Sequence, residues 1–106
     1  MASDKAYLTY VLEQLSHLEE ITYRSMMGEF LLYYRGRLFG GIYDNRLLVK
    51  PVSSALQMMP EALQEQPYPG AAAMLLVERL DDPAFLRKLI DAMYPELPEP
   101  KKKKRK

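Results

Sequence analysis

The chain has 106 residues, with 15 basic and 14 acidic side chains and no cysteine. This length fits one domain, and the lack of cysteine excludes disulfides, thiolate chemistry and zinc–thiolate sites. The net charge of +1 is unevenly distributed: residues 101–106 are all basic, and without them nine basic and fourteen acidic side chains leave a charge of −5. An acidic body argues against a dedicated reader of duplex DNA, because such domains carry positive charge on the folded face.

No stretch of the sequence approaches the about 20 apolar residues that a membrane-spanning helix needs. The first residues, Met1–Lys5, lack the basic-then-apolar pattern of a secretory signal peptide. We therefore expect a soluble, cytoplasmic protein without membrane contact.

The first element expected in the chain is a helix over Ser3–Leu18. Ser3 or Asp4 can accept a hydrogen bond from an unpaired backbone N–H as the N-cap residue. Apolar residues recur at spacings of one, three and four and form one stripe, made up of Tyr7, Leu8, Val11, Leu12, Leu15 and Leu18.

Four short strands are predicted next, over Ile21–Met27, Glu29–Arg35, Arg37–Tyr43 and Arg46–Lys50. Each is rich in aromatic and aliphatic residues, and turn signals at Gly28, Arg35-Gly36 and Asp44-Asn45 separate them. Such runs joined by two-residue turns indicate an antiparallel meander.

The second half of the chain predicts a short helix over Ser53–Met59, ended by Pro60, and a strand over Ala73–Leu80. A last helix begins at Asp82-Pro83, with aspartate as N-cap and proline at the first helical position, and runs to about Tyr94. Prolines and like charges predict a disordered basic tail over residues 96–106.

The order helix, four-strand meander, helix, strand, helix predicts an α+β fold over residues 1–95. The simplest packing has two layers, with an antiparallel sheet of about five strands covered by helices on one face.

The turns also predict which residues of the meander share a face, because directly opposed residues lie on the same side of a sheet. Two-residue turns at Arg35-Gly36 and Asp44-Asn45 pair Leu32 with Phe39 and Ile42 with Leu47. The candidate core face then contains Leu31, Tyr33, Leu38, Ile42, Leu47 and Val49. The opposite face, a candidate partner-binding face, contains Phe30, Leu32, Tyr34, Arg37, Phe39, Tyr43, Arg46, Leu48 and Lys50.

The candidate partner-binding face is too apolar for an ordinary wet surface, and three interpretations remain open. A helix or loop of the same chain covers it. A protein partner or a second copy of the chain binds it, since aromatics with arginine are typical interface anchors. Single-stranded nucleic acid binds it, since aromatics stack bases and basic groups hold phosphates. A bulged turn would exchange the two faces beyond it.

No catalytic constellation emerges from the sequence. His17, the one histidine, is predicted near the end of the first helix without a neighbouring nucleophile. The acidic residues show no metal-ligand spacing, and Gly40-Gly41 lacks the strand-to-helix context of a phosphate loop, so a bulge or a close backbone approach explains it better. We expect no enzymatic activity, no metal and no cofactor.

The tail contains a continuous basic run, Lys101, Lys102, Lys103, Lys104, Arg105 and Lys106. Such a run binds nucleic acid nonspecifically or resembles a nuclear-import peptide, and the simpler interpretation is a solubilising tail.

A set of motifs in this sequence resembles the N-terminal domain of the TfoX/Sxy family of bacterial competence regulators. The resemblance covers roughly residues 5–95, and Met27 stands where the family usually has phenylalanine. The matching motifs are Arg24, Met26-Met27-Gly28, Tyr33-Tyr34, Gly36, Leu47-Leu48-Val49-Lys50, Tyr68-Pro69-Gly70, Met74 and Asp81-Asp82-Pro83.

The resemblance implies an α+β fold similar to secretion-chaperone-like domains and a non-enzymatic, regulatory role. Longer family members assist a transcription factor at competence promoters, whereas their separate C-terminal domain has no counterpart in this sequence. We expect an interaction domain that acts by protein–protein contact, with a transcription factor or a second copy as partner. The alternative is a module that binds single-stranded nucleic acid through the basic tail and the aromatic face.

Overall fold

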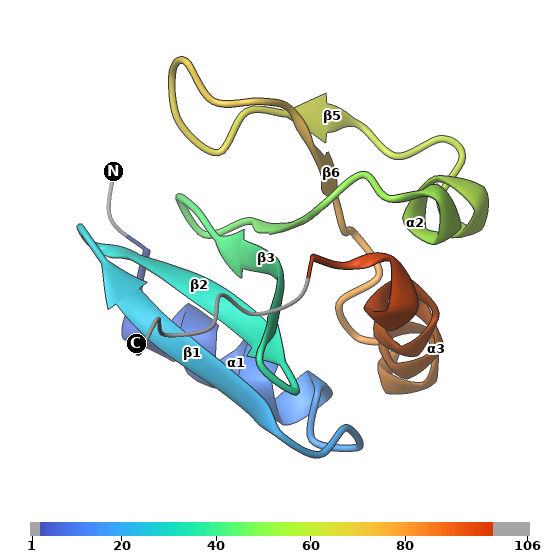
Figure 1. Cartoon of the computed structure of the whole chain (residues 1–106). Coiled ribbons are helices and arrows are strands. Elements are labelled where there is room, and N and C mark those ends of the chain that lie inside the picture. The colour runs from blue at the N-terminus through green and yellow to red at the C-terminus, as the bar shows by residue number, and fades with distance from the viewer. Residues whose placement is uncertain (1–2, 99–106) are drawn as a thin grey trace, which may run out of the picture.

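The computed structural model describes residues 3–98, and within them the strands form a single antiparallel sheet in the order β1-β2-β3-β4-β6-β5 (Figure 1). The elements follow in the order α1 (Lys5–Gln14), β1 (Ile21–Met26), β2 (Glu29–Tyr34), β3 (Arg37–Ile42), β4 (Leu47–Val49), α2 (Ser53–Met58), β5 (Gln64–Glu65), β6 (Met74–Leu76), α3 (Pro83–Met93) and the 3-10 helix η1 (Tyr94–Glu96). The predicted α+β class is confirmed, and the unpredicted strand β5 raises the number of strands to six in the described part of the chain.

Three two-residue turns connect the meander. They lie at Met27-Gly28 (φ 52° and 87°), Arg35-Gly36 (52° and 85°) and Asp44-Asn45 (54° and 56°). The sequence predicts the turns at Arg35-Gly36 and Asp44-Asn45, whereas the first turn also includes Met27, which the sequence places at the end of a strand. Two consecutive positive φ angles are the mark of type I′ turns, whose twist matches that of the strands they join. Tyr34 therefore pairs with Arg37 directly across the second turn.

A β-bulge in β3 changes the register that the turns alone predict. Tyr33 pairs with Leu38, but Leu32 pairs with Gly40, so Phe39 is the extra residue and the predicted Leu32–Phe39 pair is wrong. A bulge shifts every later side chain of its strand relative to the partner. As a result Ile42 lies opposite Phe30 and on the same face.

The glycine pair beside the bulge has the close backbone approach that the sequence suggests. A Cβ atom on Gly40 would lie 2.1 Å from the carbonyl oxygen of Leu48, and one on Gly41 would lie 2.6 Å from that of Phe30. No side chain fits at these distances, so the tight β2–β3–β4 packing depends on both glycines.

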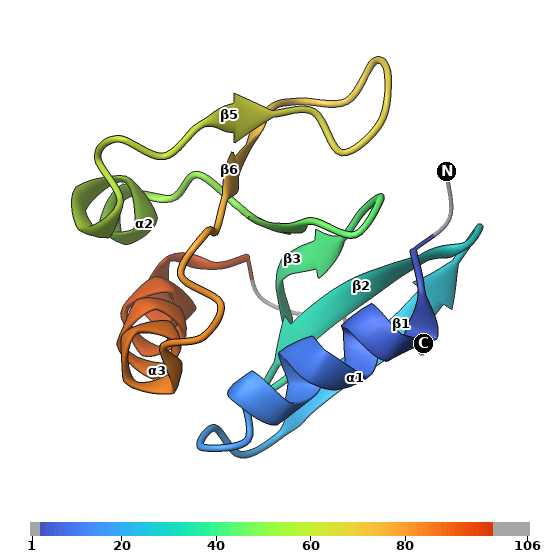
Figure 2. The same ribbon diagram turned by 180° about the vertical axis from the view of Figure 1, so that it is seen from behind.

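The core lies between the helices and one face of the sheet, which we call the inner face. Figure 2 shows α1 lying across β1 and β2, with α3 beside the other end of the sheet. All three helices contribute buried residues to one apolar cluster with the inner face, among them Leu8, Val11 and Leu15 of α1, Ala55 of α2, and Phe85, Leu86, Leu89, Ile90 and Met93 of α3. Both predicted helical stripes therefore face the core.

Helix α3 begins where the sequence predicts. The Asp82 carboxylate accepts a hydrogen bond from the Phe85 backbone N–H at 3.1 Å, and Pro83 takes the first helical position. This hydrogen bond and the one from Arg79 lower the pKa of Asp82. Helix α1 is shorter than predicted, and Asp4 occupies the N-cap position without a side-chain hydrogen bond.

The ordered domain extends past the predicted boundary at residue 95. Glu96 accepts hydrogen bonds from the backbone N–H and the hydroxyl of Ser54, at 2.8 and 2.9 Å, and so caps the N-terminus of α2. Leu97 is buried in the core. The prediction of disorder is therefore wrong for residues 96–98, because the segment buries an apolar side chain and binds a helix terminus. Residues 99–106, with the basic run, lie outside the described part of the chain.

Over residues 3–98, no helix has both the length and the apolar character needed to cross a bilayer.

Candidate partner-binding groove

The inner face contains four of the nine sheet residues predicted to bind a partner. Phe30, Leu32, Tyr34 and Phe39 have exposed fractions of 5, 0, 8 and 0%. Helices α1 and α3 cover them, so the prediction of an exposed aromatic face is wrong and the first interpretation, coverage by the same chain, is correct here. The physical reason is that the apolar stripes of both helices must be buried against an apolar face of the sheet, and this face provides one.

Two further predicted residues lie on the opposite side of the sheet, the outer face, but are also buried. Leu48 pairs with Gly41 and is fully buried, whereas Tyr43 is 5% exposed. The Tyr43 ring covers Gly41, where an added Cβ would lie 2.8 Å from the ring. On the outer face, the buried side chains of Tyr43 and Leu48 therefore form a closed surface over β3 and β4.

The two predicted arginines hold the chain's own segments together. Arg37 donates to the backbone oxygens of Tyr94 and Leu97 at 3.1 and 3.2 Å, and its guanidinium lies 4.4 Å from the centre of the Tyr94 ring. These contacts attach η1 and the following residue to β3. Arg37 therefore has a structural role in this fold.

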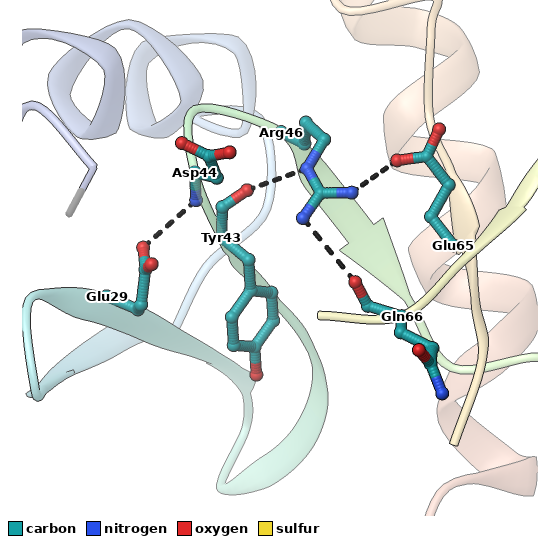
Figure 3. Close-up of polar contacts among 6 residues, drawn as sticks. All are labelled: Glu29, Tyr43, Asp44, Arg46, Glu65 and Gln66. Atoms are coloured by element: carbon teal, nitrogen blue, oxygen red, sulfur yellow. Dashed lines mark hydrogen bonds and ion pairs between the residues drawn. The ribbon is translucent and has the colours of Figure 1, made fainter. Parts of the chain in front are cut away.

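Arg46 makes the matching connection between β4 and β5 (Figure 3). Its guanidinium forms an ion pair with Glu65 and donates to the backbone oxygens of Tyr43 and Gln66, at 3.0 and 3.5 Å. These contacts fix the position of the β5–β6 segment next to the Asp44-Asn45 turn.

A second polar cluster fixes the other side of this turn. The Glu29 carboxylate accepts from the Ser3 hydroxyl at 2.6 Å. It also accepts from the Asp44 backbone N–H at 3.1 Å (Figure 3). The Asn45 N–H donates to the Ser3 hydroxyl at 3.1 Å. Glu29 thus has a structural role: it binds the start of the described chain to the meander.

Lys50 is the one predicted basic residue of the sheet that stays available. Its side chain is half-buried at the end of β4, and its ammonium group forms no ion pair or hydrogen bond within residues 3–98. A cation without a counter-charge favours binding of an anionic group.

Lys50 lines a groove of about 510 Å³ on the outer face, which we call the outer groove. Leu38 and Tyr43 come from the meander, and Tyr68 and Met74 come from the β5–β6 segment. Tyr68 is 53% exposed, and its ring centre lies 6.4 Å from that of Tyr43. The groove therefore joins two aromatic rings, aliphatic side chains and one available cation.

One wall of the outer groove is a loop that is held by hydrogen bonds between its own residues. Gln66 donates through its side-chain amide to the Ala71 oxygen at 2.8 Å, and the Ala71 N–H donates to the Tyr68 oxygen at 3.1 Å. Gly70 has a φ of 89°, a conformation that glycine adopts at little cost. These contacts hold Tyr68 at the rim.

Burial, followed by the neighbouring Tyr68, raises the pKa of Tyr43 above its usual value. Its hydroxyl therefore stays neutral at physiological pH. Lys50 then supplies the charge of the outer groove, and the two tyrosines supply rings and hydrogen-bonding hydroxyls.

A second hollow, of about 440 Å³, lies between α2 and the start of α3 and includes Met58 and Met59. Its arginine is already engaged: Arg79 pairs with Asp82 at 2.8 Å and lies 4.0 Å from the centre of the Phe85 ring. The outer groove is the better candidate because its cation is available.

His17, Glu19 and Glu20 line one polar hollow together with Asp91. His17 is exposed. Within residues 3–98, no three histidine, aspartate or glutamate side chains lie close enough together to hold a metal ion.

Leu38, Tyr68 and Met74 were not predicted as site residues. The signal for Tyr68 is its position in the loop Gln66-Pro67-Tyr68-Pro69-Gly70, since an aromatic residue in such a loop has no strand or helix to bury it. Leu38 was assigned to the core face, because the register prediction placed it there.

The structure is a small α+β domain. Helices cover the inner face of its sheet, and the outer groove lies on the outer face. The family model of the TfoX N-terminal domain matches residues 13–94, and the chain belongs to this family. The family is one of non-catalytic regulatory domains and suggests a competence-related role.

A relative of similar length occurs in Spirochaeta aurantia, described as an uncharacterized 12.7 kDa protein in the trpE 5′ region. It is 30% identical over 108 residues, which cover 100% of this chain and 93% of the relative. No solved structure matches the chain, so the likeness to secretion-chaperone-like domains stays a prediction.

Proposed function

We propose that this chain is a regulatory interaction domain whose outer groove binds an extended apolar segment of a protein partner in the cytoplasm. A carboxylate of that segment pairs with Lys50, and its apolar side chains pack on Leu38, Tyr43 and Tyr68. The observation that carries the proposal is the combination of an apolar groove with a cation that has no counter-charge in the described part of the chain.

The composition of the outer groove supports a peptide rather than a small metabolite. Its polar groups are few, and rings at the rim are the residues that dominate protein–protein contacts. The resemblance to competence regulators favours a transcription factor as the partner, which would make this domain a co-regulator of transcription.

The proposal is tested with a displayed library of random peptides selected against the full chain. We expect selected peptides to combine apolar residues with aspartate or glutamate, and Lys50→Glu to weaken their binding about tenfold or more. Lys88→Glu, the same charge reversal on the exposed side of α3, is the matched control and leaves binding unchanged. Peptides without acidic residues, or binding indifferent to Lys50→Glu, would contradict the proposal.

Nucleic-acid binding is a second candidate, supported by the basic run at Lys101–Lys106 alone. The aromatic face that was predicted to stack bases is buried. A chain without residues 101–106 should therefore lose its whole affinity for single-stranded oligonucleotides at low salt. Affinity that survives this deletion would restore a role for the folded domain.

A further inference from the structure

The two edges of the sheet differ in length and exposure. β5, at one edge, has two residues, whereas β1, at the other, has six. Figure 1 shows β1 along the outer margin of the sheet, paired on one side with β2. Four consecutive residues of β1, from Thr22 to Ser25, are exposed.

The turn geometry shows which backbone groups of β1 are unpaired. Met26 and Glu29 flank a two-residue turn, and such flanking residues exchange both of their backbone hydrogen bonds. At the other end, the Arg35 N–H donates to the Glu20 oxygen at 3.0 Å. Even-numbered residues of β1 therefore bond to β2, and the N–H and C=O groups of Ile21, Tyr23 and Ser25 point to the free edge.

The usual protection of an edge strand is missing from β1. Proteins cover long edges or interrupt them with proline, bulges or several charges. β1 contains no proline, pairs with β2 in continuous register, and carries Arg24 as its single charge. No backbone hydrogen bond beyond the β1–β2 ladder reaches Ile21, Tyr23 or Ser25 from residues 3–98.

We propose that β1 pairs with β1 of a second copy of this chain, antiparallel and with Tyr23 opposite Tyr23. This register uses all three unpaired residues, because Tyr23 exchanges hydrogen bonds with its copy and Ile21 exchanges them with Ser25 of the copy. The two sheets join into one, and the symmetry is a two-fold axis between the Tyr23 residues.

Charge selects this register over the one centred on Arg24. With Tyr23 opposite Tyr23, Arg24 lies opposite Thr22 of the copy, and Glu20, the residue before β1 of the copy, lies at the diagonal position. Diagonal neighbours lie within reach of long side chains, so two symmetric Arg24–Glu20 pairs form. Sliding the copy by two residues, which moves the two-fold axis from Tyr23 to Arg24, would place the two Arg24 residues directly opposite one another, which like charges disfavour.

Tyr23 adds a further contact on the inner face. The Tyr23 side chain is 47% exposed and packs edge-on against Phe30, with 5.9 Å between ring centres. The two Tyr23 rings extend this aromatic row across the edge. Pairing of five residues from each copy buries little area, so the dimer is weak and depends on concentration.

Single-cysteine variants test the register directly, because the chain has no cysteine of its own. Opposed residues of this kind have Cα atoms about 5.5 Å apart, within the span of a disulfide. We expect Tyr23→Cys to form a covalent dimer under mild oxidation, while Arg24→Cys, placed diagonally at about 7–8 Å, does not. Crosslinking through Arg24→Cys instead, or through neither, overturns the proposal.

Sedimentation measurements from micromolar to millimolar concentration test the pairing in solution. Tyr23→Pro removes an N–H that β2 does not use, so it keeps the fold and weakens self-association about tenfold or more. Arg24→Glu also weakens it, and the exchange Glu20→Arg with Arg24→Glu restores it. Lys88→Glu is the control for charge. A monomer at every concentration, or a dimer indifferent to Tyr23→Pro and unrestored by the charge exchange, overturns the proposal.

Discussion

The inner and outer faces of the sheet are built from similar residues but differ in what covers them. Phe30 and Leu32 of the inner face are 5 and 0% exposed, while Leu31 and Tyr33, alternating with them on β2, stay half-exposed. Helices α1 and α3 pack on the inner face, and the β5–β6 segment borders the outer one. Composition alone therefore does not distinguish a core face from a binding face in a strand that is apolar on both sides.

The largest loss of stability is expected from deleting a buried side chain of the inner face. Phe39→Ala deletes a fully buried ring at the bulge, which should lower the free energy of unfolding by about 3–5 kcal/mol. Leu38→Ala, one residue away on the outer face, is the matched control and should cost much less. Urea unfolding measures both, and equal losses would contradict the difference between the faces.

A somewhat smaller effect is expected where the two faces meet at the glycine pair. Gly40→Ala places a Cβ atom against the Leu48 carbonyl and should cost about 3 kcal/mol, because backbone must move. Gly70→Ala has open space around it and suffers the strain of positive φ alone, about 1 kcal/mol. Thermal unfolding of both variants compares them, and a Gly40→Ala protein as stable as Gly70→Ala would disprove the close approach.

The free energy of unfolding should fall at alkaline pH because of one tyrosine on each face, Tyr34 on the inner and Tyr43 on the outer. Burial and the hydrogen bond to Asp91 at 2.8 Å raise the pKa of Tyr34, and burial raises that of Tyr43. Because the folded state favours the protonated hydroxyls, their contribution is complete below pH 10 and is lost as pH rises through the folded-state pKa values.

The measurement is the free energy of unfolding from pH 8 to pH 11 for the parent protein, Tyr34→Phe and Tyr43→Phe. Each variant should lose stability less steeply above pH 10 than the parent. Parallel curves for all three proteins would show that neither hydroxyl is linked to folding.

The smallest effect on stability is expected at the rim of the outer groove. Tyr68→Ala removes a half-exposed ring from a loop and should change the free energy of unfolding by about 0.5 kcal/mol or less. Binding of peptides selected against the outer groove should nevertheless fall. A variant that binds them as the parent does would remove Tyr68 from the site.

Much of the fold could be predicted from local signals. The Asp82-Pro83 helix start, the apolar stripes of both long helices and the turns at Arg35-Gly36 and Asp44-Asn45 depend on neighbouring residues, so the sequence contains the whole cause. β5 was missed because two residues give no alternation, and the order of residues 96–98 was missed because it depends on distant contacts of Leu97 and Glu96.

The candidate site was predicted less well than the fold. Of its nine sheet residues, Tyr43 and Lys50 line the outer groove, and the others are buried or hold the chain together. The error has one source in the bulge at Phe39 and another in the assignment of the helices to the wrong face of β2. Neither cause is visible in the alternation of apolar residues.

The sequence by itself determined the two long helices, the strands of the meander and the absence of thiol chemistry, because these follow from side chains and their neighbours within a few positions. The tertiary structure decided which sheet face the helices cover, which arginines are engaged and which edge stays unpaired. Those outcomes depend on contacts between residues far apart in the chain, where burial of apolar area and the satisfaction of charges select among packings that the local pattern allows equally.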